Sequence, residues 1–349
     1  MWKVLTEFRL ALAFLCLLAL LPTLAQQSES IRAAGLDVLS IDGPKPKDVL
    51  AVAVGDGAAW ILTKDRLAKM DAITGAWSAV PVPPVKTWSW DFSNATIAAG
   101  SLWVTGKVNK VQGVHRIDLK TGQLTSSIPI RYPSQTVGGD TALWIFSGGR
   151  NGTLFRIDPQ TNTSSRSIQP GKEFGQPQFA DGSLWVINPD NGTVRRFDPE
   201  STKMLDEFSV ARPHEHGFLT NFVYYFAVHN GDVWVNEASG EKSFLTRIDA
   251  TTHRRIAEVR VDNSEFAPVF WNGFVWLSTD SVFNIIKVDP RTNHIAGQIT
   301  VPAAQGPVAT VPFLFADKDT LWAVRKVGYT IYGHLTIQRI RIAAAETKQ

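Results

Sequence analysis

The sequence predicts an all-β chain whose mature part folds as a single seven-bladed β-propeller of four-stranded antiparallel blades. Three observations support this fold: a recurring tryptophan motif, a recurring aspartate turn, and strand-like alternation without helical stretches from about Val49 onward. Successive motif tryptophans stand 41 to 49 residues apart, a period typical of four short strands per blade. The seven are Trp60, Trp103, Trp144, Trp185, Trp234, Trp276 and Trp322.

The first 25 residues have the features of a signal peptide. Two basic residues precede an apolar run over 10–21, and small or tolerated residues stand at the cleavage positions, with cleavage expected after Ala25. The run is shorter than the roughly 20 residues that span a bilayer, so a retained anchor is the weaker alternative. We therefore expect the mature chain, 26–349, to be exported to the periplasm or the extracellular space, without a membrane span after cleavage.

Cysteine usage and charge exclude several classes of function. Cys16 is the only cysteine and lies in the apolar run, so the mature chain has no thiol for disulfides, nucleophilic catalysis or thiolate metal sites. The net charge is only +3 and no run of basic residues occurs. We therefore expect no nucleic-acid partner, and we expect a monomer.

Each repeat contains an apolar strand, a tight turn, the tryptophan strand, a third strand ending in aspartate, and a fourth strand. Aspartate can accept hydrogen bonds from the backbone two residues on, while the Pro, Gly and Asn that follow suit the other turn positions. The sequence therefore predicts a structural role for these aspartates. They are Asp71, Asp118, Asp158, Asp198, Asp249 and Asp289.

A basic residue stands two positions before each turn aspartate, on the same face of its strand. Solvation or ion pairing explains this position without a ligand, so we interpret these residues as part of the scaffold. They are Lys69, Arg116, Arg156, Arg196, Arg247 and Lys287.

The seventh repeat is incomplete. Residues 338–342 occupy its third strand but run into a polar tail without a turn or a fourth strand. Residues 36–41 form a strand-like segment before the first repeat, with no repeat of their own. We expect this N-terminal strand to complete the last blade, since closure of the ring removes exposed sheet edges.

The repeated Leu-Trp-Val followed by Arg-Ile-Asp-Pro-x-Thr resembles bacterial extracytoplasmic propellers of the streptogramin (virginiamycin B) lyase-like and YVTN-type repeat group. For the lyase, the resemblance implies a magnesium-dependent site that combines a Pro-His-Gly segment with a glutamate three residues after a blade tryptophan. One blade partly matches, with His214 and His216 before it and Glu237 three positions after Trp234.

The lyase resemblance also implies roles for these residues. His214 or His216 would be a general base or metal ligand, Glu237 a metal ligand or acid, and Mg²⁺ or another divalent cation the cofactor. The other blades carry different residues at the position of Glu237. These are Thr63, Gly106, Ser147, Asn188, Thr279 and Arg325.

A second resemblance concerns residues 71–77, which resemble the tryptophan-docking repeat of pyrroloquinoline-quinone dehydrogenases. Those enzymes use the motif in several blades of an eight-bladed ring. Here it occurs once in a seven-repeat chain, which disfavours a quinoprotein.

The lengths of the connections predict where function lies. In a propeller, the loops between second and third strands share one face with the links between blades, around the mouth of the central channel. The long connections of this chain belong to that group. We predict that Trp90, His214, His216, Glu237 and Tyr329 border one pocket there. The ligand-binding residues that we predict on this face are Trp88, Trp90, Lys326, Tyr329 and Tyr332.

Two functions remain open from the sequence. The first is a binding or scaffold propeller that takes a small molecule, glycan, peptide or protein on this face, and the second is a metal-dependent lyase or hydrolase. An alternative interpretation of the insertions is that they plug the channel.

Overall fold

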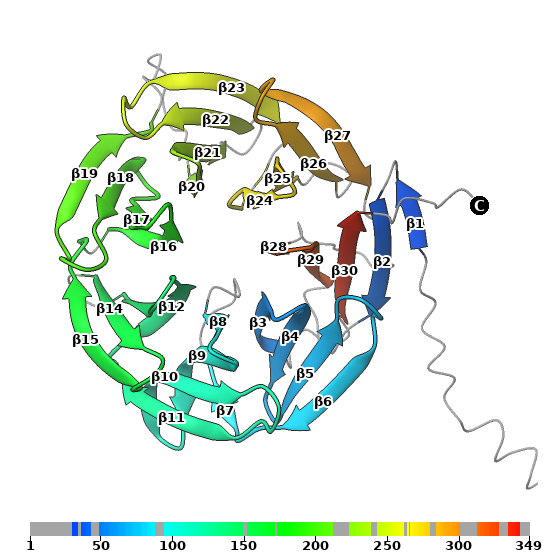
Figure 1. Cartoon of the computed structure of the whole chain (residues 1–349), viewed down its shortest axis with the longest axis vertical. Helices are drawn as coiled ribbons and strands as arrows, with labels where there is room; N and C mark the ends of the chain where they lie inside the picture. Colours follow the sequence, from blue (N-terminus) through cyan, green and yellow to red (C-terminus); the bar gives the residue numbers. More distant parts are fainter. Residues whose placement is uncertain are drawn as a thin grey trace, which may run out of the picture.

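The structure is a computed structural model that describes residues 30–33, 36–42, 49–87, 94–148, 152–171, 173–211, 223–238, 243–261, 264, 266–279, 284–300, 313–327 and 334–342. Within these ranges the regular structure consists of β-strands, arranged as seven antiparallel sheets in a ring (Figure 1). The predicted seven-bladed β-propeller is thus confirmed. The predicted signal peptide, 1–25, lies outside the described residues.

Six blades lie in chain order (Figure 1). Their strands run outward from the ring axis in sequence order, except that the first two strands of blade two both pair with its third strand. Blade one contains β3 (Val49–Gly55), β4 (Ala58–Thr63), β5 (Arg66–Asp71) and β6 (Trp77–Pro81). Blade two contains β7 (Val85–Lys86), β8 (Ala95–Ala98), β9 (Ser101–Val108), β10 (Val111–Asp118) and β11 (Leu124–Pro129). Blade three contains β12 (Pro133–Gly138), β13 (Leu143–Ser147), β14 (Thr153–Asp158) and β15 (Thr163–Ile168). Blade four contains β16 (Gly175–Ala180), β17 (Ser183–Ile187), β18 (Thr193–Phe197) and β19 (Met204–Ser209). Blade five contains β20 (Val223–His229), β21 (Asp232–Ala238), β22 (Ser243–Asp249) and β23 (Arg255–Val261). Blade six contains β24 (Val269–Trp271), β25 (Phe274–Ser278), β26 (Asn284–Asp289) and β27 (His294–Thr300).

Blade seven joins the two ends of the chain. Its strands, from the inside outward, are β28 (Phe313–Asp317), β29 (Thr320–Val327), β30 (His334–Ile342), β2 (Leu36–Asp42) and β1 (Ser30–Ala33). The pairing of β2 with β30 confirms that the N-terminal strand completes the last blade. The outer strand β1 pairs with β2 and makes this sheet one strand wider than predicted.

The repeated tryptophans fill the interfaces between blades. Trp60 of blade one, for example, packs in one cluster with Leu102 and Val104 of blade two. The indole N–H of Trp60 donates to the carbonyl of Gly55 at 3.1 Å, and that of Trp103 donates to Ala98 at 3.2 Å. Each such indole therefore buries its ring while its polar atom closes the preceding turn.

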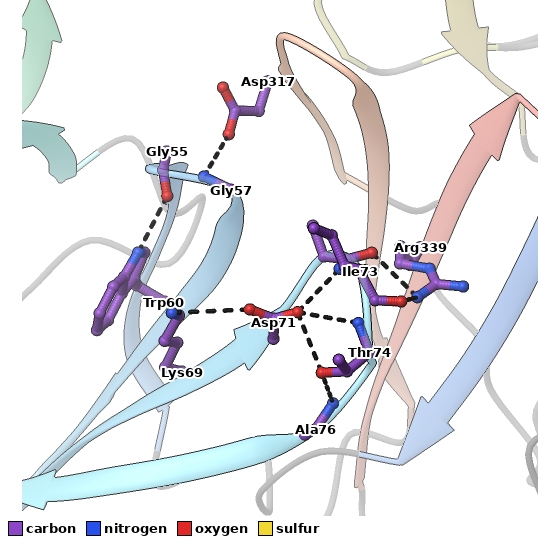
Figure 2. A network of polar contacts seen from close by, with 11 residues as sticks. Gly55, Gly57, Trp60, Lys69, Asp71, Ile73, Thr74, Ala76, Asp317 and Arg339 are labelled. Atoms are coloured by element: carbon purple, nitrogen blue, oxygen red, sulfur yellow. Dashed lines mark hydrogen bonds and ion pairs between the residues drawn. The ribbon is translucent and has the colours of Figure 1, made fainter.

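The aspartate turns have the predicted structural role. Oδ1 of Asp71 accepts hydrogen bonds from the backbone N–H groups of Ile73 and Thr74, both at 2.9 Å, and from the Thr74 hydroxyl (Figure 2). The hydrogen bond from the Thr74 backbone holds the pKa of Asp71 below its usual value. Oδ1 accepts from the backbone in the same way at Asp118, Asp158, Asp198, Asp249 and Asp289.

Several of the basic residues before these turns link neighbouring blades. The guanidinium of Arg116 lies 5.2 Å from the Trp103 ring centroid and donates to the carbonyl of Pro159 in blade three at 2.7 Å. At the ring closure, Arg339 donates to the carbonyls of Ala72 and Ile73 (Figure 2). It also donates to Oδ2 of Asp37 at 2.8 Å. The basic residues thus have the scaffold role that we predicted, and some of them fulfil it by linking neighbouring blades.

The alternating strand directions place the connections on two opposite faces. We call the turn face the end that carries the tight turns between first and second strands and the aspartate turns. We call the loop face the end that carries the connections between second and third strands and the links between blades. The described residues contain no helix that is long and apolar enough to cross a membrane.

Candidate functional site on the loop face

Most of the predicted site residues fall in parts of the chain that the structure leaves undescribed. Trp88, Trp90, His214, His216, Tyr329 and Tyr332 lie outside the described residues, and Lys326 is described only as a backbone position in β29. The predicted pocket that joins Trp90, His214, His216, Glu237 and Tyr329 therefore stays a prediction. Glu237 is the predicted site residue whose side chain is described.

The strands that flank the undescribed site segments nevertheless end on one face. Segment 212–222 follows β19 and precedes β20, while 328–333 connects β29 to β30. Both pairs of strands meet at the loop face, because the antiparallel order of each blade fixes which end of a strand lies there.

Glu237 is half of an ion pair at the junction of blades four and five. Its side chain is 1% exposed, and Oε1 accepts hydrogen bonds from the Thr246 hydroxyl at 3.1 Å and from Nη1 of Arg255 at 3.2 Å. Arg255 also donates through Nη2 to the carbonyl of Val210 in blade four at 2.7 Å. The guanidinium thus compensates the buried carboxylate and bridges two blades.

These contacts do not fit a magnesium ligand. A carboxylate oxygen that accepts from a guanidinium faces a positive charge, which opposes a divalent cation at the same place. Among the described residues, no three His, Cys, Asp or Glu side chains gather in a group that could hold a metal ion. The predicted metal site also includes His216, which lies outside the described residues, so that site stays a prediction.

Residues at the position equivalent to Glu237 have structural roles in several other blades. The hydroxyl of Thr63 donates to the Arg66 carbonyl, and the hydroxyl of Ser147 donates to the Arg131 carbonyl. Oδ1 of Asn188 accepts from the backbone of Asp190. Arg325 is also buried here, and burial lowers its pKa to about 10. A buried polar side chain at the loop-face end of the second strand is therefore common in this ring.

Three aromatic side chains form a different feature of the loop face, which we call the aromatic ledge: Tyr225, Phe266 and Phe313. The ring centroids of Tyr225 and Phe266 are 6.5 Å apart, and those of Phe266 and Phe313 are 4.3 Å apart. Tyr225 and Phe313 lie near the loop-face ends of innermost strands, and Phe266 lies in the link between blades five and six. The ledge thus joins three blades, and all three residues are half-buried.

A buried amide positions the centre of this ledge. Asn236, 0% exposed, donates from Nδ2 to the carbonyls of Ser264 and Phe266 and to the Ser264 hydroxyl, each at 3.0 Å. The backbone N–H of Ser264 in turn donates to the Ser243 hydroxyl at 3.0 Å. The link that carries Phe266 is therefore fixed by hydrogen bonds that water cannot easily replace.

The innermost strands of blades three and four carry amide side chains in their loop-face halves. Oε1 of Gln135 accepts from the backbone N–H of Gln176 at 3.0 Å, and Nε2 of Gln178 donates to the carbonyl of Phe226. The inner strands therefore differ in character around the ring, with amides in blades three and four and the ledge in blades five to seven.

The predicted residues Trp88 and Trp90 stand between two short described strands of blade two. The segment 88–93 lies between β7 and β8, which both pair with β9 at the inner side of the sheet. The side chains of Thr87 and Asn94, on either side of this segment, both donate to the carbonyl of Leu50, at 3.1 and 3.2 Å. The described residues on either side of this segment thus both contact the innermost strand of blade one.

Sequence reasoning missed the ledge because its members lie outside the repeated motif. A signal did exist: aromatic residues stand at or near the loop-face starts of the inner strands of blades five and seven, beside long connections. Their proximity depends on contacts between blades, which the sequence alone does not show.

Comparisons with known proteins support the architecture. No protein-family model matches this chain, and no curated protein matches it either. Among solved structures, the chain is similar to BamB from Moraxella catarrhalis, with 14% identity, a TM-score of 0.52, and coverage of 90% of this chain and 94% of that one.

Two further structures have the same likeness. A chain of the mitotic checkpoint complex is 13% identical, with a TM-score of 0.59 and coverage of 93% of this chain and 94% of that one. The Pan2 WD40 domain of Neurospora crassa is 10% identical, with a TM-score of 0.57 and coverage of 85% and 90%. At these identities the similarity shows a shared propeller fold.

Proposed function

We propose that this chain is an exported binding propeller that holds a peptide or protein segment on its loop face, at the aromatic ledge. The observation that carries the proposal is the contact of Tyr225, Phe266 and Phe313 across three blades. Aromatic side chains provide much of the energy of protein recognition when they are rigid and only partly covered. The propeller fold is consistent with such a binding or scaffold role.

The surroundings of the ledge support this choice of face. Long connections flank it, because Phe313 directly follows segment 301–312 and β20, which carries Tyr225, directly follows segment 212–222. On the turn face, the described aspartates and several arginines are engaged in the turns and in contacts between blades. Loops on a rigid scaffold are the usual place of recognition. The ion pair of Glu237 with Arg255 favours binding over a metal-dependent lyase.

An affinity experiment tests the proposal. The mature protein, immobilised, is exposed to the exported proteins of its own cells, and captured proteins are quantified by mass spectrometry. The double variant Phe266→Ala with Phe313→Ala should capture about tenfold less of the specific partner than the wild type, because two aromatic contacts are lost.

A matched control separates the ledge from general stickiness. Ile295→Ala removes a side chain that is 49% exposed at the turn-face end of β27 and should leave capture unchanged. Circular dichroism must show that all variants melt as cooperatively as the wild type. Equal capture by the ledge variant and the wild type, or turnover of a defined substrate by the purified protein, would contradict the proposal.

A further inference from the structure

Blade three departs from the contact that the other arginine-bearing blades make beside the tryptophan. In blade five, Nε and Nη2 of Arg247 contact Oδ2 of Asp232 at 2.8 and 2.6 Å, two positions before Trp234. In blades two and four, the hydroxyls of Ser101 and Ser183 take the place of this carboxylate. In each of these three blades, a side chain of the same blade thus accepts a hydrogen bond from the guanidinium.

In blade three the acceptor two positions before the tryptophan is missing, because the equivalent residue is Ala142. Arg156 pairs with Trp144 in the sheet exactly as Arg247 pairs with Trp234. Among the described residues, it donates only through Nη2, to Thr141 Oγ1 at 3.4 Å and Glu200 Oε1 at 3.2 Å. Glu200 is 64% exposed, so this partner competes with water and can be displaced at small cost.

The missing side chain coincides with a pocket of about 220 Å³ between blades three and four on the turn face. Ala142 and Arg156 line it, together with the apolar surfaces of Trp144, Phe179 and Pro199. Asp140 and Glu200 stand at the same pocket. The pocket therefore combines a guanidinium, aromatic walls and two carboxylates.

We propose that this pocket binds a small monocarboxylate with an aromatic or compact apolar body. The carboxylate would take the position that the Asp232 carboxylate has beside Arg247, where Ala142 leaves space, and would bond to Nε and Nη2 of Arg156. Such charge-assisted hydrogen bonds are roughly twice as strong as hydrogen bonds between neutral groups. The apolar body lies against Phe179 and Pro199, because the Trp144 ring is only 1% exposed.

The charges at the pocket also select the ligand. Asp140 and Glu200 disfavour a second negative charge through repulsion, so dicarboxylates and phosphates bind less well than a single carboxylate. A neutral amide of the same shape cannot form the charge-assisted pair. The site lies on the face opposite the aromatic ledge and does not depend on the proposed function.

Fluorobenzoate is a suitable probe, titrated into the mature protein and followed by fluorine NMR. We expect a dissociation constant on the order of 1 mM, as for one charge-assisted pair and one partly buried ring. Fluorobenzamide should bind at least about tenfold more weakly, because it cannot form the ion pair. Arg156→Gln should weaken fluorobenzoate binding by a similar factor.

The most informative variant is Ala142→Asp, which gives blade three the arrangement of blade five. The new carboxylate should occupy the ligand's place, abolish fluorobenzoate binding and raise the melting temperature. Loss of binding can then not be attributed to unfolding. Ala58→Asp makes the same change at the same repeat position of blade one, beside Lys69, and should leave binding unchanged.

Three results would overturn the proposal. They are no saturable binding of fluorobenzoate to the wild type below about 10 mM, equal binding of fluorobenzamide, and undiminished binding to Ala142→Asp.

Discussion

Glu237→Gln tests whether Glu237 belongs to an ion pair between blades. The substitution keeps an acceptor oxygen for Thr246 but removes the charge that faces Arg255. The Glu237 side chain is 1% exposed and that of Arg255 is 31% exposed, so water screens one partner only. Breaking a fully buried pair costs about 3–5 kcal/mol, whereas exposed pairs contribute less than about 1 kcal/mol. We expect an intermediate loss of about 2 kcal/mol in the free energy of unfolding.

Urea unfolding of the mature protein, combined with a double-mutant cycle, measures this energy. Arg255→Met keeps much of the side-chain volume without the charge, and its coupling with Glu237→Gln should be about 1–2 kcal/mol. Glu258→Gln is the matched control, because Glu258 lies 3.8 Å from the same Arg255 but is 44% exposed. Its effect should stay below about 0.5 kcal/mol.

Magnesium provides the refuting measurement. If Glu237 were a metal ligand, a saturating concentration of Mg²⁺ at about 100 times the dissociation constant would stabilise the wild type by about 2.7 kcal/mol. This gain would vanish in Glu237→Gln. We expect the unfolding midpoints to be independent of Mg²⁺. Additive effects of the two substitutions, or a magnesium response that Glu237→Gln removes, would refute the ion-pair reasoning.

Three other predictions concern the scaffold. His115 is buried and contacts the Ser127 hydroxyl and the Gly106 carbonyl. Burial lowers the pKa of its imidazole in the folded protein. The stability that neutral His115 contributes is therefore complete above the unfolded pKa of about 6.5, and it is lost as pH falls from there toward the lower folded pKa. Thermal melts of wild type and His115→Gln between pH 8 and 5 check this, and equal slopes would contradict it. Asn236→Leu removes the amide that donates to the carbonyls of Ser264 and Phe266. The free energy of unfolding, measured in urea, should fall by about 1–3 kcal/mol. An unchanged urea midpoint would show that water replaces the amide. Deletion of residues 30–42 removes β1 and β2 and exposes the edge of β30, so size-exclusion chromatography should show aggregation, and a stable monomer would contradict this role for ring closure.

The local elements of the ring followed from the sequence because their causes are local. An aspartate accepts from backbone groups two and three residues on, as at Asp71, whatever the distant chain does. The seven tryptophans repeat because each blade buries the same position of its second strand. Even ring closure was predictable, since 36–41 was a strand without a repeat and the seventh repeat lacked a strand.

The tertiary structure decided what depends on contacts between blades. The pairing of Arg255 with Glu237, the approach of Phe266 to Phe313, and the pocket beside Arg156 involve side chains on different strands or in different blades. The outer strand β1 and the pairing of both β7 and β8 with β9 also depend on the tertiary structure. The physical reason is that the turn chemistry and the strand alternation act within a few residues, whereas the packing of one sheet on the next depends on shapes and charges far apart in sequence.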